Sequence, residues 1–236
     1  MIRSSQPKPQ RTRLFRIIAF FTHFQIGYLV RTMKSPRLFV ILFAVSAGAV
    51  ALGIITAVAY LTDLPLVFPP LAASAFIIFY TPMSERASPK NVILAHTMGL
   101  LAGLSSLLLL RALFPESDIL NPSHMSFLRV ATIGLAMALS SALMILLKCV
   151  HPPAAATALI AAMGYIISAA QVSGFIAAVV LLVLEAFLVN RVLGGIPYPC
   201  WRYDPKVVQD YRALAGLSNV KMTFWELMST RIFQRR

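Results

Sequence analysis

A chain of 236 residues in which 58% are hydrophobic and only 12% are charged has too few charged side chains to cover the surface of a soluble protein. Its mean hydropathy of +0.78 points to a membrane protein. Eight of the 21 basic residues lie in residues 1–37 and eight in residues 191–236, on either side of the apolar region. We therefore expect membrane-flanking charge and no nucleic acid as a partner.

Residues 1–37 are expected to form a basic cytoplasmic tail. Within it, residues 14–30 mix aromatic side chains with Arg16, His23 and Gln25, a pattern typical of a helix that lies in the membrane interface. A seventh crossing at this place would put one of the two basic ends outside, so we expect both termini in the cytoplasm. The polar start shows no transit-peptide pattern, which favours a bacterial inner membrane.

Residues 38–190 are expected to form the transmembrane domain. They contain six apolar segments, at residues 38–61, 69–81, 92–110, 127–147, 152–169 and 172–189. The second is short and the fifth is borderline against the ~20 residues that a helical crossing needs. Each of these two could be a span, a half-helix or a re-entrant loop.

Loop charges favour six crossings. With all six, three basic loop residues fall on the cytoplasmic side together with both basic ends and three acidic ones fall outside, so nearly every loop satisfies the positive-inside rule. The basic residues are Arg86, Lys90 and Lys148, and the acidic ones are Asp63, Glu116 and Asp118. If the two short segments do not cross, this separation of charge is lost.

An internal repeat divides the domain. The run Phe68-Pro-Pro-Leu-Ala-Ala-Ser-Ala-Phe-Ile77 recurs as His151-Pro-Pro-Ala-Ala-Ala-Thr-Ala-Leu-Ile160. Three crossings in each repeat, over about residues 38–113 and 127–190, would insert the two copies in opposite orientations, as in many secondary transporters. We predict an all-α integral membrane protein of two three-helix repeats with inverted topology, in which short helices begin at the Pro-Pro pairs.

The two Pro-Pro helix starts are the candidate anion site. Proline suits the first helical turn, and the positive dipole ends of both helices would face one cavity. We expect the N–H groups of Leu71, Ala72, Ala154 and Ala155 to be free for an anion. The predicted substrate-binding residues are Pro69, Pro70, Leu71, Ala72 and Ser74 in the first copy, and His151, Pro152, Pro153, Ala154, Ala155 and Thr157 in the second.

Small and hydroxylic residues near these starts have two interpretations. Ser74 and Thr157 occupy equivalent positions of the repeat, and could offer hydroxyls to an anion or bond the carbonyl one turn back. Gly99, Gly103 and Gly134 are expected to form contact faces between helices, without a chemical role.

Four ionisable residues are candidates for gating or proton coupling. His151 stands where the first copy has Phe68, and can be neutral or charged near physiological pH, although an imidazole that caps the helix is the competing interpretation. For His96 we favour a packing contact. Lys148 could attract anions or anchor the interface. Glu185, with Arg191 six residues away, could serve packing or carry a proton.

Metal binding and catalysis have little support. Cys149 and His151 lie two residues apart, but the apolar segments hold no Cys-x-x-Cys, no His-x-x-x-His and no carboxylate cluster, so we predict no metal site. No nucleophile elbow or phosphate-binding glycine loop occurs, and we expect neither an enzyme nor a cofactor. Cys149 and Cys200 are both expected at the cytoplasmic side, as free thiols.

Two longer runs resemble a known family. Lys148-Cys-Val-His-Pro-Pro-Ala-Ala-Ala-Thr-Ala-Leu159 and Pro82-Met-Ser-Glu-Arg-Ala-Ser-Pro-Lys-Asn-Val-Ile-Leu-Ala-His96 are similar to the HPP family of integral membrane proteins, over roughly residues 37–199. The resemblance implies membrane transport, with nitrite the substrate associated with chloroplast and cyanobacterial members. The family is usually described with four spans, whereas the loop charges here favour six. Some bacterial relatives carry paired CBS modules after the membrane part, where this chain has about forty residues.

Residues 191–236 carry Trp201, Tyr203, Tyr211 and Trp225 among eight cations, which is typical of a tail on an anionic cytoplasmic leaflet or of a partner-binding tail. We predict a membrane transporter or channel for a small inorganic anion, nitrite first, bound between the two Pro-Pro helix N-termini. The alternative is a membrane scaffold or sensor in which the repeated motif serves only helix packing. A unit this small could form a homo-oligomer.

Overall fold

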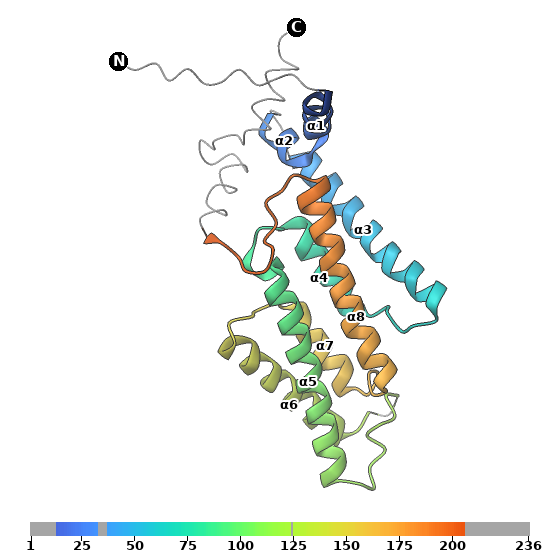
Figure 1. Ribbon diagram of the computed structural model, residues 1–236. Helices are drawn as coiled ribbons and strands as arrows, with labels where there is room; N and C mark the ends of the chain where they lie inside the picture. The colour runs from blue at the N-terminus through green and yellow to red at the C-terminus, as the bar shows by residue number, and fades with distance from the viewer. Residues whose placement is uncertain (1–12, 33–36, 124, 206–236) are drawn as a thin grey trace.

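The computed structural model describes residues 13–32, 37–123 and 125–205, which hold helices and no strand (Figure 1). The helices are α1 (Arg13–Phe24), α2 (Ile26–Thr32), α3 (Arg37–Thr62), α4 (Pro69–Tyr80), the 3₁₀ turn η1 (Glu85–Ala87), α5 (Pro89–Leu113), α6 (Phe127–Leu146), α7 (Pro153–Ala162), α8 (Ala169–Ala186) and its π-helical continuation η2 (Phe187–Leu193). The order long, short, long occurs twice, in α3 to α5 and in α6 to α8.

Four of the described helices are long and apolar enough to cross a membrane: Arg37–Thr62, Pro89–Leu113, Phe127–Leu146 and Ala169–Leu193. The two short helices, α4 and α7, have 12 and 10 residues. At 1.5 Å per residue they are about 18 and 15 Å long, roughly half of the hydrocarbon thickness. As helices alone, they are too short to make the two further crossings that the loop charges favour.

Local sequence explains where most helices begin. The hydroxyls of Ser88, Ser126 and Ser168 accept N–H bonds at the starts of α5, α6 and α8. The short helices have no side-chain cap and begin at their proline pairs instead. The predicted segment of residues 152–169 is wrong at its end, because α7 stops at Ala162 and Gly164 turns the chain with a φ of +87°.

The two short helices run in opposite directions. Phe68 packs on Phe175, and the Asn190 side chain donates to the Ile78 carbonyl, so α4 runs parallel to α8. Backbone contacts between Gly99 and Ala154, and four residues later between Gly103 and the second half of α7, set α7 parallel to α5. Since α5 and α8 are antiparallel in Figure 1, α4 and α7 point opposite ways.

Glycines allow α5 and α7 to touch along their backbones. A Cβ atom on Gly99 would collide with the Ala154 carbonyl oxygen, and one on Gly103 would lie 2.5 Å from the Ala158 carbonyl oxygen. The predicted contact face at these two glycines is therefore confirmed. For Gly134 the prediction is wrong, because a Cβ there would meet no atom within 4 Å.

The N-terminal segment forms two helices, and not the single helix over residues 14–30 that the pattern suggested. The chain breaks at Gln25, whose side chain donates to the Val192 carbonyl at 3.1 Å, and Gly27 N–H donates to the Gly194 carbonyl at 2.9 Å. These contacts hold α1 and α2 against the end of η2. Most of the two basic tails, residues 1–12 and 206–236, lies outside the described residues.

Candidate functional site

His151 lies in the connection between α6 and α7 and has no exposed surface. Its Nδ1 atom is 2.8 Å from the Arg86 carbonyl oxygen, and its Nε2 atom is 2.9 Å from Ser74 Oγ. The ring makes no capping bond to α7. His151 therefore joins the second Pro-Pro start to α4 and to η1, and the capping interpretation is wrong.

His96, about two turns into α5, is also fully buried. Its Nε2 atom is 2.8 Å from Ser74 Oγ, and its Nδ1 atom is 2.8 Å from Thr157 Oγ1. The two hydroxyls at equivalent positions of the repeat thus bind the two nitrogens of one imidazole. His96 packs on Phe175, as expected, but it is also the polar link between the two short helices.

We call Thr157, His96, Ser74 and His151, with the Arg86 carbonyl, the hydroxyl–imidazole chain. Its hydrogens can be assigned because a carbonyl only accepts, so His151 Nδ1 carries a hydrogen. In the neutral ring Nε2 is then bare and accepts from the Ser74 hydroxyl. The Ser74 hydroxyl donates its one hydrogen to His151, so Ser74 Oγ accepts from His96 Nε2–H. His96 Nδ1 then carries no hydrogen and accepts from the Thr157 hydroxyl. All hydrogen bonds then point one way, from Thr157 to Arg86.

Burial keeps His151 neutral in this arrangement. It lowers the pKa of His151 to about 4, while the hydrogen bond to the Arg86 carbonyl opposes the shift. The assignment above, which requires a bare Nε2, is therefore the one expected at pH 7.

The depressed pKa of His151 predicts acid sensitivity. Between pH 6.5 and about 4 the unfolded chain binds a proton at this residue that the folded chain does not, so the free energy of unfolding falls as the pH falls, by about 3 kcal/mol at most. We expect the unfolding temperature in detergent to decrease from pH 7.5 to pH 5, and less steeply in His151→Asn. An equally steep decrease in the variant would contradict this assignment.

The N–H groups expected to be free at the helix starts are mostly bonded. Leu71 N–H donates to the Phe68 carbonyl at 3.1 Å, and the N–H groups of Ala154 and Ala155 donate to the carbonyls three residues back, at 3.0 Å. The prediction is wrong for these three groups because each start tightens into a turn with bonds over three residues. An anion could reach them only if these turns opened.

The eleven predicted substrate-binding residues differ in exposure. Of the eleven, the buried ones are Pro70, Leu71, Ser74, His151, Pro153, Ala154 and Thr157, whereas Pro69, Ala72 and Pro152 are exposed and Ala155 is half-buried. The structure brings Ser74, Thr157 and His151 together around His96. Ser74 Oγ is also 3.1 Å from the Pro70 carbonyl, the contact one turn back that the second interpretation of this hydroxyl expects, while a role toward an anion stays a prediction.

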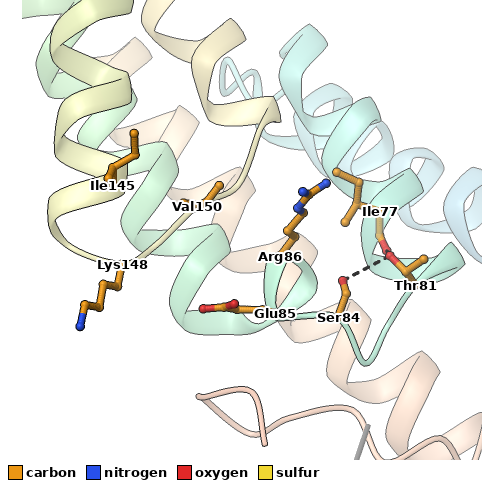
Figure 2. A pocket seen from close by; sticks show the side chains of 8 residues that line it. All are labelled: Ile77, Thr81, Ser84, Glu85, Arg86, Ile145, Lys148 and Val150. Carbon is orange, nitrogen blue, oxygen red and sulfur yellow. Dashed lines mark hydrogen bonds between the residues drawn. The ribbon is translucent and has the colours of Figure 1, made fainter. Parts of the chain in front are cut away.

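A cavity of about 630 Å³ opens to the surface next to this chain of hydrogen bonds (Figure 2). In Figure 2 the Arg86 side chain points toward Ile77, while Lys148 extends outward from the rim. Both cations line the cavity together with Glu85. Arg86 thus has its guanidinium at the cavity and its carbonyl on buried His151. Sequence reasoning used Arg86 only for topology, although it lies within the run Pro82 to His96.

Glu185 lies apart from these residues. It is 7% exposed on α8, and neither carboxyl oxygen has a hydrogen-bond partner among the described residues. Arg191, the nearest cation in the sequence, donates to the Tyr198 carbonyl and lies over the Phe187 ring. Within the described part of the chain, no three His, Cys, Asp or Glu residues are grouped for a metal.

Arg129 is a buried cation that the sequence reasoning missed. It is 1% exposed on the first turn of α6 and donates to the carbonyls of Ala162, Asn121 and Ile119. Ala162 is the last residue of α7, where a cation is favoured by the helix dipole. The sequence feature that could have identified Arg129 is that it is a single arginine inside a long apolar segment.

Comparison with known proteins gives the family. The model of the HPP transmembrane region matches residues 33–199. A transmembrane protein of Dictyostelium discoideum is 32% identical over 138 residues, which are 55% of this chain and 43% of that protein, so the chain spans less than half of that relative. No solved structure matches significantly. Because the match includes α3 to α8 and both Pro-Pro starts, the chain belongs to the HPP family of transmembrane proteins.

Proposed function

We propose that this membrane protein is a transporter or channel for a small inorganic anion, nitrite first. The observation that carries the proposal is that α4 and α7, which begin with the same Pro-Pro sequence, meet at one buried imidazole through equivalent hydroxyls. A polar site that joins two repeated short helices within an apolar bundle is the layout of a secondary transporter.

The opposite directions of α4 and α7 support an inverted repeat. In this proposal α3 to α5 and α6 to α8 insert in opposite orientations, and the extended residues beside each short helix complete its crossing. Both termini then lie in the cytoplasm, and the cavity with Arg86 and Lys148 opens to the same side. The bacterial inner membrane remains the expected location.

The anion would enter at the cavity and move toward the helix starts. Arg86 and Lys148 attract it, and His151 lies directly behind Arg86. Since the buried side chains have no exposed surface, passage requires α4 and α7 to separate, which exposes the N–H groups of both helix starts. Movement of one repeat against the other would alternate access to the two sides.

Uptake of nitrite into proteoliposomes tests the proposal. We expect saturable uptake by the wild-type protein, with nitrate and chloride as competitors, and at least a tenfold loss in His151→Ala. Glu116→Gln, an exposed change in the loop after α5, is the control and should retain uptake. Gel filtration must show each variant folded.

Two results would overturn the proposal. Folded wild-type protein that transports no more nitrite, nitrate or chloride than empty liposomes excludes anion transport and favours the scaffold or sensor. If His151→Ala lowers the unfolding temperature but leaves uptake intact, the site between the helix starts is excluded.

A further inference from the structure

We propose that the hydroxyl–imidazole chain binds one proton at His151 Nε2, with the Ser74 hydroxyl turning from that nitrogen to the Pro70 carbonyl, and that this proton is taken up together with the anion. The anion half of this inference rests on the proposed function. The proton half rests on the hydrogen-bond geometry alone.

Ser74 can satisfy both protonation states of His151. Its oxygen lies 2.8 Å from His96 Nε2, 2.9 Å from His151 Nε2 and 3.1 Å from the Pro70 carbonyl. A hydroxyl has one hydrogen and two lone pairs. With neutral His151, the hydrogen goes to His151 and one lone pair accepts from His96. With charged His151, the hydrogen turns to Pro70 and both lone pairs accept from the two imidazoles.

The proton balance of this step is simple. One N–H bond forms at His151 Nε2 as an O–H bond of a hydronium ion from the solvent breaks and leaves water, the Ser74 O–H bond only rotates, and no covalent bond within the protein breaks. Every donor of the chain has an acceptor before and after the step, so neither state leaves a buried polar group without a partner.

His151 is the proton acceptor, and His96 is not. A proton on His96 would go to Nδ1, and the Thr157 hydroxyl would lose the acceptor that it has there. Within the described residues Thr157 makes no other side-chain hydrogen bond. The two ring centroids are 5.1 Å apart, so charge on both rings at once is disfavoured. The hydroxyl–imidazole chain therefore takes up one additional proton, and not two.

Within the described residues, α4, η1, α5, α7 and the connection before α7 carry no buried carboxylate. The His96 ring and the Arg86 carbonyl contact His151, and the other titratable groups at this end of η1, α5 and the connection are Glu85, the Arg86 guanidinium, Lys90, Lys148 and Cys149. On α4, the described side chain that forms a hydrogen bond with His151 is that of Ser74. The helix α7 has no titratable residue. Glu85 is exposed at the cavity, and burial raises the pKa of the Cys149 thiol, which stays neutral.

An anion in the cavity supplies the missing charge. Arg86 has its guanidinium at the cavity and its carbonyl on His151, so an anion held by that cation lies beside the residue that carries the proton. The pKa of about 4 belongs to the arrangement without an anion, and a bound anion raises it. By linkage, a proton on His151 tightens anion binding by the same factor.

Nitrogen-15 NMR of the histidine side chains tests the geometry without transport. Without anion at pH 7, we expect opposite neutral tautomers, with the hydrogen on Nε2 in His96 and on Nδ1 in His151. Saturating nitrite at pH 6 should convert His151, and not His96, to the doubly protonated form. The same tautomer in His96 and His151, or a His151 signal that does not change when nitrite is added, would overturn the inference.

Proton uptake into liposomes tests the coupling. With a pH-sensitive dye, we expect a nitrite gradient to drive proton movement in the wild type and at least tenfold less in Ser74→Ala. The control is Ser140→Ala, which removes a buried serine hydroxyl that has no partner among the described residues, and it should behave as the wild type. Nitrite uptake without proton movement overturns the inference and leaves the proposed function standing. If no nitrite enters at all, the proposed function fails. The histidine tautomers measured by NMR then still test whether His151 Nε2 is the proton-binding atom.

Discussion

Replacing Gly99 by alanine is expected to destabilise the protein by about 3 kcal/mol, as overpacking in a rigid contact does. The added Cβ atom would collide with the Ala154 carbonyl oxygen, which belongs to the backbone of α7 and cannot rotate away. Since α7 would have to move off α5, Thr157 would also be drawn away from His96. The unfolding temperature in detergent measures the loss.

Gly134→Ala is the matched control for this change. Both glycines lie within long helices, but a Cβ atom on Gly134 meets no atom within 4 Å. Alanine favours a helix over glycine by about 1 kcal/mol, so this variant should be as stable as the wild type or more stable. Equal losses in the two variants would show that the backbone contact between α5 and α7 has no special weight.

Replacing Arg129 by glutamine is expected to cost about 3 kcal/mol and to loosen the end of α7. The guanidinium donates to three carbonyls, and glutamine can serve at most two of them, without charge. Lysine keeps the charge but lacks the planar fork, so Arg129→Lys should recover only part of the stability. Thermal unfolding in detergent and protease cleavage between α6 and α8 measure the two effects.

Arg111→Gln is the control for this second change. Arg111 lies in the last turn of α5 and is exposed, so its loss should change stability by about 0.5 kcal/mol or less. If Arg129→Gln is as stable as this control, Arg129 does not hold α7 in place.

The sequence predicted the helices well where local signals decide. The apolar runs fix the long helices, and the proline pairs mark the starts of α4 and α7. The end of α7 was missed because Gly164 turns against the Leu120 carbonyl, a contact between distant residues.

The same limit applies to the site. The repeat and the His-Pro-Pro run singled out Ser74, His151 and Thr157, but not how they are joined. Ser74 is 22 residues from His96 and 77 from His151, and no local pattern specifies such hydrogen bonds. Arg129 was missed for this reason, since its partners are carbonyls brought to it by the fold.

The glycine contact between α5 and α7 also limits how the protein can open. Their backbones touch at Gly99 and Gly103, which holds a helix of the first repeat to a helix of the second, so the proposed movement between the repeats would have to pivot at this contact while α4 parts from α7. Among the described residues, the side-chain hydrogen bonds from α4 or α8 to α5, α7 or His151 are those of Ser74. In that movement the two bonds of this one hydroxyl would break, together with the apolar contacts that α4 and α8 share with α5 and α7 in the core.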